Sequence, residues 1–372
     1  MRFPEFQGEW EKCKLGDIAE FSTARVSSVK LDCKNYVSTE NMLQDFQGVV
    51  EAKSVPNETN VISFTCGDIL ISNIRPYLKK VWKATFDGGC SSDVFVLQAT
   101  DTVAKDYLHY AVANDKFINY VMSGAKGVKM PRGDKNQMRT YQLSLPSIQE
   151  QYKIAKLLTL LDERIATQSK LIEDLKKLKS AIIEKLYKEI QGTWYSYRQL
   201  FSIINERNKL LEYSNVLSAS QERGMVSRED LNLDIHFERS NISTYKIVKN
   251  GDYVIHLRSF QGGFAFSEKT GICSPAYTVL RPNNLLVYGY LSNYFTSRDF
   301  VKSLIIVTYG IRDGRSINVD EWLDMKVVIP SKEQQTHIVN VIESIENKIK
   351  NEETYSNCLL NQKQYLLRQM FI

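Results

Sequence analysis

The chain carries two similar copies of one long sequence, and this internal repeat constrains its fold more than any other feature. Residues 145–165 read LPSIQEQYKIAKLLTLLDERI, and residues 329–349 read IPSKEQQTHIVNVIESIENKI, 184 residues further on. A solenoid repeat has only about 20–50 residues. The longer period therefore predicts a duplicated domain, and two copies of it account for nearly all of the 372 residues.

Further matches keep one register along the two copies. At a shift of 184, Trp10 matches Trp194, and Gly67-Asp68 matches Gly251-Asp252. The pairs at a shift of 183 are Arg75 with Arg258, Cys90 with Cys273, Tyr107-Leu108 with Tyr290-Leu291, Phe117 with Phe300 and Gly127 with Gly310. At Pro146-Ser147 and Pro330-Ser331 the shift is again 184. One deletion and one compensating insertion explain the series, so we interpret the chain as a tandem duplication.

The first part of each copy is predicted to be an α+β domain, over residues 1–147 and 191–331. VISFTCGDILISN and CSSDVFVLQA in the first copy, and YKIVKNGDYVIHL and CSPAYTVLRP in the second, are short and rich in Val, Ile, Phe and Tyr. Gly, Asp or Asn bound these segments, as is typical of strands. A helical segment is expected near 105–122 and near 288–305.

The second part of each copy is predicted to be one long helix, over residues 148–190 and 332–372. Neither segment contains Pro or Gly, and apolar residues recur at alternating spacings of four and three, as in a coiled-coil seam. The predicted seam residues are Ile154, Leu158, Leu161, Ile165, Ile172, Leu175, Ile182 and Leu186, then Ile338, Ile342, Ile345, Ile349, Leu359 and Leu366. Polar seam positions also correspond, because Gln168 matches Glu352 and Lys179 matches Lys363.

The two seams are expected to cover each other. A helix of this length spans about 60 Å at 1.5 Å per residue, which is too long for one face of a single small domain. We therefore expect an antiparallel coiled coil that separates two α+β domains and relates them by a pseudo-twofold axis. The alternative is that each helix packs against its own domain.

Composition excludes several classes of protein. The chain is 43% hydrophobic and 24% charged, with a formal net charge of +5. Such a composition is typical of a globular protein, and no apolar run is long enough to span a membrane. The N-terminal segment has no apolar region of the kind found in secretory signals. The six Cys and four His residues show no zinc-ligand spacing, so no metal site is expected, and free thiols favour a cytoplasmic protein.

At this point the order of segments resembles a known family, the specificity subunits of type I restriction–modification enzymes. GDILIS, which precedes Asn73, and P-S-x-x-E-Q, from Pro146 to Gln151, are similar to recurring signatures of that family. The second copy departs from the latter by one residue and reads PSKEQQ. The resemblance implies two target-recognition domains that read double-stranded DNA, no catalysis and no cofactor in this chain, and a cytoplasmic location in a bacterium or archaeon. It also implies two methyltransferase (modification) subunits and restriction/translocase subunits as partners, which would carry S-adenosylmethionine, ATP and Mg.

The duplication offers a way to sort candidate DNA contacts. Phosphate contacts position a protein, whereas base contacts specify a sequence, so basic residues kept in both copies are candidates for phosphates and divergent ones for bases. The kept candidates are Arg75 and Arg258, Lys129 and Arg312, and Arg132 and Arg315, with Lys126 and Lys135 in the same basic stretch. The divergent candidates are Tyr77, Lys79, Lys80, Gln221, Arg223 and Gln261. For Arg75 and Arg258 the alternative is a buried ion pair with Asp68 or Asp252.

Two other functions stay open at this point. The chain could be a structural coiled-coil scaffold whose two domains bind proteins. It could also be an enzyme, but the sequence contains no G-x-G-x-x-G, no GxxxxGK[ST] and no GxSxG motif. Because the two domains share a scaffold but differ in sequence, a DNA-reading chain of this kind would recognise an asymmetric target made of two half-sites.

Overall fold

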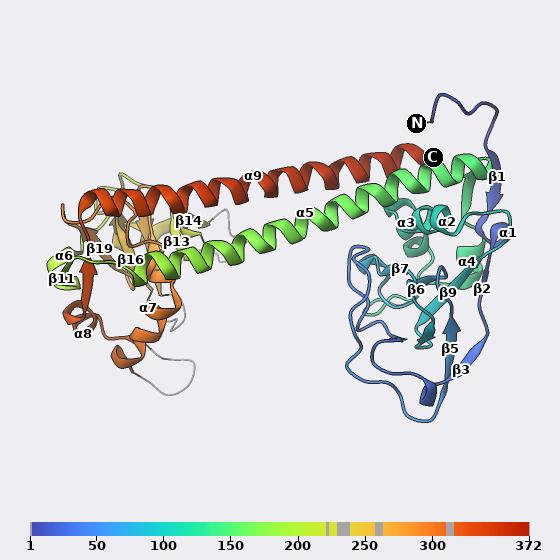
Figure 1. Cartoon of the computed structure of the whole chain (residues 1–372), viewed down its shortest axis with the longest axis horizontal. Coiled ribbons are helices and arrows are strands. Elements are labelled where there is room, and N and C mark those ends of the chain that lie inside the picture. Colours follow the sequence, from blue (N-terminus) through green and yellow to red (C-terminus); the bar gives the residue numbers. More distant parts are fainter. Residues whose placement is uncertain (1, 221–222, 229–238, 257–262, 310–315, 372) are drawn as a thin grey trace. The chain divides into compact units, whose positions relative to one another are not determined.

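The computed structural model describes residues 2–220, 223–228, 239–256, 263–309 and 316–371. The chain divides into two compact units: unit 1 holds residues 1–169 and 354–372, and unit 2 holds residues 170–353. Each unit consists of one α+β domain and half of each long helix, α5 (Ile148–Lys188) and α9 (Lys332–Met370). The expected fold class, two α+β domains with two long helices, is confirmed (Figure 1).

The domain of unit 1 contains two four-stranded sheets. The first has the order β2 (Ala19–Phe21), β9 (Val94–Ala99), β6 (Ile69–Ser72) and β7 (Val81–Lys83), and all its pairs are antiparallel. The second has the order β3 (Arg25–Ser27), β5 (Asn60–Phe64), β8 (Gly88–Cys90) and β4 (Tyr36–Val37). A further pair joins β1 (Glu11–Lys14) to β10 (Gln142–Leu145). The helices are α1 (Leu15–Ile18), α2 (Lys105–Val112), α3 (Asp115–Ser123) and α4 (Lys135–Arg139), with 3₁₀ turns η1 (Ser28–Lys30) and η2 (Pro76–Leu78).

The domain of unit 2 repeats this plan. Its antiparallel sheet has the order β12 (Phe201–Ile204), β19 (Thr278–Pro282), β16 (Tyr253–Ile255) and β17 (Phe264–Phe266). Strand pairs join β11 (Thr193–Ser196) to β22 (Lys326–Ile329), β13 (Leu217–Ser220) to β14 (Gly224–Ser227), β15 (Lys246–Val248) to β18 (Gly271–Cys273), and β20 (Thr308–Tyr309) to β21 (Ser316–Ile317). The helices are α6 (Tyr197–Leu200), α7 (Arg298–Ser303) and α8 (Val319–Asp324), with 3₁₀ turns η4 (Arg239–Thr244), η5 (Tyr294–Thr296) and η6 (Leu304–Val307).

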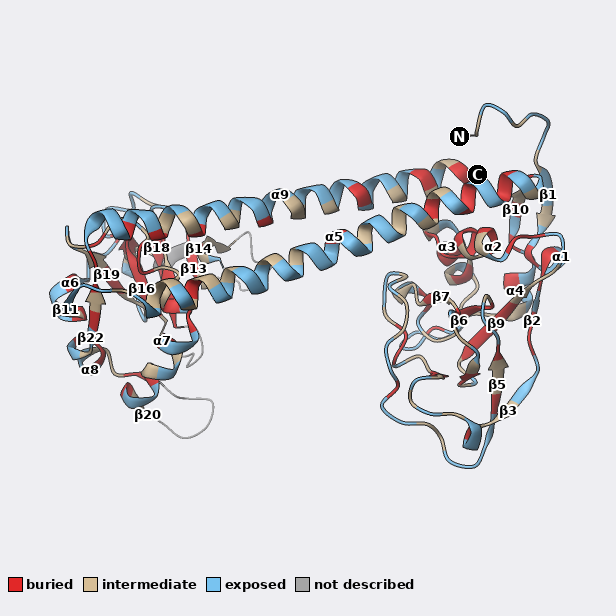
Figure 2. Cartoon of the chain, in the orientation of Figure 1, coloured by how far each residue is buried: buried red, intermediate tan, exposed pale blue. Residues whose placement is uncertain are grey.

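Each unit has its own hydrophobic core (Figure 2). In unit 1 the helices α2 and α3 contribute Tyr107 and Phe117, which are fully buried together with Leu97 of β9. In unit 2 the stacked rings of Tyr197 and Trp322 lie 4.3 Å apart at their centroids. Burial of such large aromatic side chains contributes strongly to the stability of a domain. Each core also includes the first turns of the long helix that follows its domain.

The structure corrects the register of the duplication at its start. A short helix begins at Leu15 in the first copy and at Tyr197 in the second. In each, the backbone amide before the helix donates to the side chain of the third helical residue, Asp17 or Gln199. The shift between the copies is therefore two residues smaller here than the 184 that Trp10 and Trp194 imply. The pairing of Trp10 with Trp194 is therefore wrong. One matching tryptophan says nothing about strand pairing. The register of the two copies at this point is fixed by the pairing of β1 with β10 and of β11 with β22.

The helical segment expected near 288–305 is only partly an α-helix. In the first copy α2 and α3 cover most of residues 105–122, but in the second copy residues 288–293 form turns before η5 and α7. Gly289 has a φ of 71°, which lies in the left-handed region and is incompatible with a right-handed helix. The first copy has Asp106 at the equivalent position, inside α2.

The Gly-Asp turn before the central strand is the same in both copies. Gly67 and Gly251 have φ values of 91° and 94°, and the following aspartate accepts a hydrogen bond from the backbone three residues earlier. The partner across the sheet differs: Gln98 donates to Asp68 at 3.0 Å, whereas Arg281 makes two 2.9 Å contacts with Asp252. The aspartate of this turn is therefore held by a neutral amide in unit 1 and by an ion pair in unit 2.

A buried glutamine attaches each domain to the start of its long helix. The Gln151 amide accepts a hydrogen bond from the Ala104 backbone at 2.8 Å and donates one to the Pro146 carbonyl at 2.9 Å. Gln335 accepts from the Val287 backbone at 2.8 Å and donates to the Pro330 carbonyl at 3.0 Å. Both side chains are almost fully buried. This attachment explains why the P-S-x-x-E-Q pattern occurs twice, with a departure only in its fifth residue.

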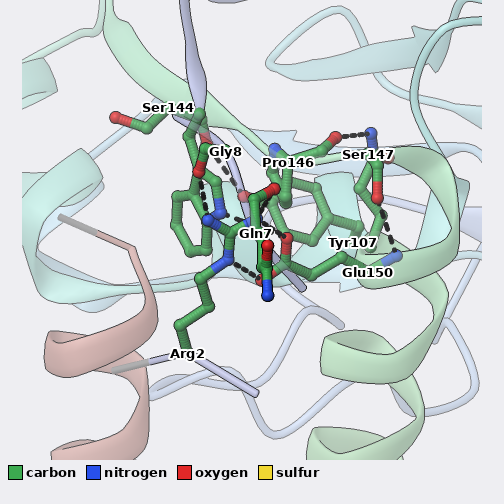
Figure 3. Close-up of polar contacts among 10 residues, drawn as sticks. Arg2, Gln7, Gly8, Tyr107, Ser144, Pro146, Ser147 and Glu150 are labelled. Atoms are coloured by element: carbon green, nitrogen blue, oxygen red, sulfur yellow. Dashed lines mark hydrogen bonds and ion pairs between the residues drawn. The ribbon is translucent and has the colours of Figure 1, made fainter. Parts of the chain in front are cut away.

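The N-terminal segment of unit 1 contacts the first turn of α5. Glu150, which is 0% exposed, forms a 2.9 Å ion pair with Arg2 and accepts a 3.2 Å hydrogen bond from the Trp10 indole (Figure 3). The guanidinium of Arg2 also donates to the carbonyls of Gln7 and Gly8. The equivalent residue in unit 2 is Gln334, which is exposed and neutral. Unit 1 therefore buries a charge that unit 2 lacks.

Within each unit the halves of α5 and α9 lie side by side and run antiparallel (Figure 1). In unit 1, Lys363 forms a 2.6 Å ion pair with Asp162. In unit 2, Lys179 forms a 2.5 Å ion pair with Glu346. These two pairs correspond at a shift of 184 residues, so the polar seam positions make the same contact in both copies.

The predicted seam residues are all buried or half-buried. The buried ones are Ile154, Leu158, Ile338, Ile342, Ile349, Leu359 and Leu366, and the half-buried ones are Leu161, Ile165, Ile172, Leu175, Ile182, Leu186 and Ile345. Ile154 and Leu158 also belong to the domain core of unit 1, as Ile338 and Ile342 do to that of unit 2. The last turns of the other helix also join each core, through Leu366 in unit 1 and Ile183 in unit 2. Packing against the domain is thus a property of the ends of the two helices.

We predict that Gln335→Ala lowers the free energy of unfolding by about 1–3 kcal/mol, because it leaves buried backbone groups without partners. Gln334→Ala is the matched control: its side chain is exposed and one residue away, so a change of about 0.5 kcal/mol or less is expected. Urea unfolding followed by circular dichroism measures both. Equal effects of the two variants would contradict the role assigned to Gln335.

We also predict that Arg2→Ala destabilises the protein by about 2–4 kcal/mol, because Glu150 stays buried without its counter-charge. The double variant Arg2→Ala/Glu150→Gln should recover most of this loss, since a neutral amide needs no ion partner and unit 2 has glutamine at this position. Thermal unfolding of the wild type, the single variant and the double variant compares the three. No recovery in the double variant would mean that Glu150 is not the reason for the loss.

Candidate nucleic-acid interface

Two basic segments that lie far apart in the sequence meet on one surface of unit 1. The first is residues 73–80, which continue from the end of β6, and the second is residues 126–135. The backbone amide of Arg75 donates to the Pro131 carbonyl at 2.8 Å, and that of Gly133 donates to the Asn73 carbonyl at 3.0 Å. Ile74 also pairs with Arg132 in an antiparallel bridge. The structure thus joins the two groups of candidate residues, which we call the basic surface.

The backbone of the first segment is held in an uncommon conformation. The 3₁₀ turn η2 lies between Arg75, with φ 50° and ψ 62°, and Lys79, with φ 54° and ψ 41°. Both residues are left-handed, although neither is glycine, and this conformation costs about 1–2 kcal/mol for a residue with a Cβ atom. Asp45 and Phe46, also left-handed, donate backbone hydrogen bonds to the carbonyls of Leu78 and Lys79. Neighbouring segments therefore hold the strained turn in place.

The four candidate side chains of this segment differ in their surroundings. Arg75 is exposed, and Tyr77 is 47% exposed. Lys79 forms a 2.8 Å ion pair with Asp115, and Lys80 donates to the carbonyl of Thr39 at 2.6 Å. Partial burial, and then the nearby charge of Arg75, lower the pKa of Lys80.

The second segment presents unpaired lysines on an exposed turn. Lys126 pairs with Arg132 in a backbone bridge, and Gly127 has a φ of 98°. Lys126 and Lys129 are exposed, and in the part of the chain that the structure describes neither has a carboxylate within ion-pair distance. Val128, between them, is 101% exposed. Arg132 is exposed and lies 3.6 Å from Asp93. Free cations on a glycine-containing turn suit contact with a phosphate backbone.

Lys135 is placed differently from the other lysines of this stretch. It begins α4, and its ammonium group lies 4.7 Å from the ring centre of Phe95 and 5.4 Å from that of Phe21. Partial burial and the charge of Arg139 lower its pKa. Its charge is thus already in contact with two aromatic rings of the domain.

The alternative that Arg75 is buried and paired with Asp68 is wrong. Arg75 is exposed, and Asp68 instead accepts hydrogen bonds from Gln98 and Thr65. In unit 2 the corresponding Asp252 is paired with Arg281. Arg258 lies outside the residues that the structure describes.

Most candidate residues of unit 2 also lie outside the described residues, namely Gln221, Arg258, Gln261, Arg312 and Arg315. Arg223 is described: it is exposed between β13 and β14, and its backbone amide donates to the Ser220 hydroxyl at 3.3 Å. The candidate residues that the structure describes therefore lie mainly in unit 1.

The structure adds residues that were not among the candidate DNA contacts. Asp45 and Phe46 support the strained turn. Asp115 pairs with Lys79 of that turn, and Asp93 pairs with Arg132. Their only signal in the sequence is position within the first domain, because left-handed backbone at a residue other than glycine has no local signature.

Among the described residues there is no group of three or more His, Cys, Asp or Glu placed to hold a metal ion. No helix there has the length and apolar character that a membrane span needs.

Comparison with known proteins identifies the class. Residues 7–177 match the family model described as the type I restriction modification DNA specificity domain. The chain is 24% identical over 402 residues to the type I restriction enzyme MjaVIII specificity subunit of Methanocaldococcus jannaschii, covering 94% of this chain and 88% of that protein. It is also 24% identical over 237 residues to the type I restriction enzyme EcoDI specificity subunit of Escherichia coli, covering 61% and 52%.

Solved structures share the fold over the whole chain. The HsdS subunit from Thermoanaerobacter tengcongensis is 18% identical with a TM-score of 0.51, covering 100% of this chain and 98% of that one. A chain from a study of complex assembly and conformational transition of the type I R-M system is 16% identical with a TM-score of 0.63, covering 98% of each. The S subunit from M. genitalium is 13% identical with a TM-score of 0.57, covering 100% and 99%.

The family model over residues 7–177, the curated specificity subunits and the HsdS structure together indicate a type I restriction–modification specificity subunit. The scaffold alternative is not favoured, because the family model and the curated relatives all describe specificity subunits.

Proposed function

We propose that each α+β domain reads one half of an asymmetric, bipartite target in double-stranded DNA. The observation that carries this proposal is the basic surface of unit 1, where two separate segments place exposed Arg75, Lys126, Lys129 and Arg132 together. Contacts from such cations to phosphates supply affinity, and side chains at the same surface can reach base edges. The divergence of the two copies at this surface supports two different half-sites.

We further propose that the chain is a non-catalytic subunit of a cytoplasmic complex. Two methyltransferase subunits and the restriction/translocase subunits would dock on it and carry S-adenosylmethionine, ATP and Mg. The family match supports this division of labour, as does the structural neighbour whose study concerns assembly of the type I R-M system. The absence of cofactor-binding motifs from the sequence is consistent with it.

The salt dependence of DNA binding tests the basic surface. We predict that Lys126→Ala/Lys129→Ala weakens binding to all duplexes and lowers the slope of log K against log salt by about 2, since each phosphate contact contributes about 0.9. Lys30→Ala/Lys34→Ala is the charge-matched control, because both lysines are exposed and lie on another segment of unit 1. Equal slopes for the two double variants would contradict the placement of the interface.

Genome-wide mapping of methylated adenines tests the function itself. The chain is co-expressed with its partner methyltransferase in a host that lacks adenine methylation. We expect one asymmetric motif of two short half-sites around a fixed gap, present only when the chain is present. If both proteins are folded and no motif appears, the scaffold function gains support and the DNA-reading proposal fails.

A further inference from the structure

We propose that Arg75 and Tyr77 are the base-reading residues of unit 1, that Arg75 recognises a guanine, and that Lys79 and Lys80 hold the turn that carries them. This assignment rests on the DNA-reading function proposed above. It differs from the sorting by duplication, which placed Arg75 among the phosphate candidates and Lys79 and Lys80 among the base candidates. The reason is that these side chains differ in their contacts, although they lie within six positions of each other.

The first argument comes from the backbone. Four left-handed residues other than glycine meet at this turn: Asp45, Phe46, Arg75 and Lys79. Three backbone hydrogen bonds of 2.8–3.1 Å tie the turn to residues 45–46 on one side and to Pro131 on the other. Strain of this kind persists only where the surroundings enforce it, and it clusters at binding sites. A turn held in this way presents its side chains without a further ordering cost on binding.

The second argument comes from the partners that each side chain already has. The Lys79 ammonium is 2.8 Å from Asp115 and 4.0 Å from Asp45, so it connects the turn to α3 and to the 45–46 segment. Lys80 is half-buried and donates to the Thr39 carbonyl at 2.6 Å. Either lysine would have to give up these contacts before its charge could reach DNA. Both therefore act as positioning residues.

Arg75 and Tyr77 are the side chains of the turn that remain available. In the part of the chain described by the structure, the Arg75 guanidinium and the Tyr77 hydroxyl have no hydrogen-bond or ion-pair partner inside the protein. Buried Pro76 separates them and fixes the backbone between them. The planar fork of an arginine matches the O6 and N7 acceptors of guanine, a match that lysine cannot reproduce.

The neighbouring turn supplies the complementary contacts. The Arg75 amide is bonded directly to Pro131, so the turn that carries Lys126 and Lys129 lies next to the base-reading turn. Phosphate-binding cations beside a rigid reading element are the arrangement that fixes the register of a protein on a duplex.

Methylation by the complex with its partner methyltransferase tests this assignment, with the wild-type motif mapped first. Arg75→Lys keeps the charge but loses the fork, so it should reduce discrimination at one G·C position of one half-site by about 10- to 100-fold. The other half-site should stay unchanged. Tyr77→Phe should alter preference in the same half-site. Lys79→Ala loosens the turn, so it should lower discrimination in the same half-site by a smaller factor than Arg75→Lys and leave the preferred base unchanged. Lys30→Ala, away from the basic surface, is the control.

Each result supports or overturns the assignment. If Arg75→Lys and Arg75→Ala leave the motif unchanged, or if Arg75→Ala weakens all duplexes equally, Arg75 is not a base reader. A motif that changes with Lys79→Ala and not with Arg75→Lys would reverse the proposed roles. If Arg75→Ala lowers the melting temperature, Arg75→Gly tests the readout in a residue that suits a φ of 50°. A wild-type complex that methylates no motif overturns the proposed function and this assignment with it.

Discussion

One buried amide in each copy fixes the relation between an α+β domain and the helix that follows it. Gln151 and Gln335 each bridge a loop of the domain and the proline before the helix, with the same donor and acceptor pattern. A buried amide that lost one of these bonds would keep an unsatisfied polar group. The domain can therefore diverge on its surface while its attachment to the helix stays the same.

This attachment matters for recognition because the candidate reading element is rigid. The turn at Arg75 follows directly from the central strand β6, and it is bonded to two other segments of the domain. Free cations at Lys126 and Lys129 lie next to it, whereas Lys79 and Lys80 are engaged inside the domain. A surface of this kind recognises a target by shape and hydrogen bonding that exist before binding, so little ordering accompanies the encounter.

The sequence predicts the larger features of this molecule and misses the local ones. The duplication, the α+β domains and the long helices follow from periodicity and from repeated segments, because hydrophobic patterning extends over many residues. The register at Trp10 is wrong and the helix expected near 288–305 forms only in part, since capping and the left-handed Gly289 act locally. Candidates on residues 73–80 and 126–135 lie together, but the sequence could not separate exposed Arg75 from tethered Lys80. That distinction depends on contacts with Thr39 and on tertiary packing.

The turn before the central strand shows how two copies of one domain differ in the substitutions that they tolerate. Asp68 is held by the neutral amide of Gln98, and Asp252 by the guanidinium of Arg281. Loss of Arg281 would leave the buried Asp252 carboxylate without its counter-charge, whereas loss of Gln98 would remove only a neutral donor from Asp68. The same position of the sheet is therefore restricted to a cation in unit 2 and is open to neutral donors in unit 1.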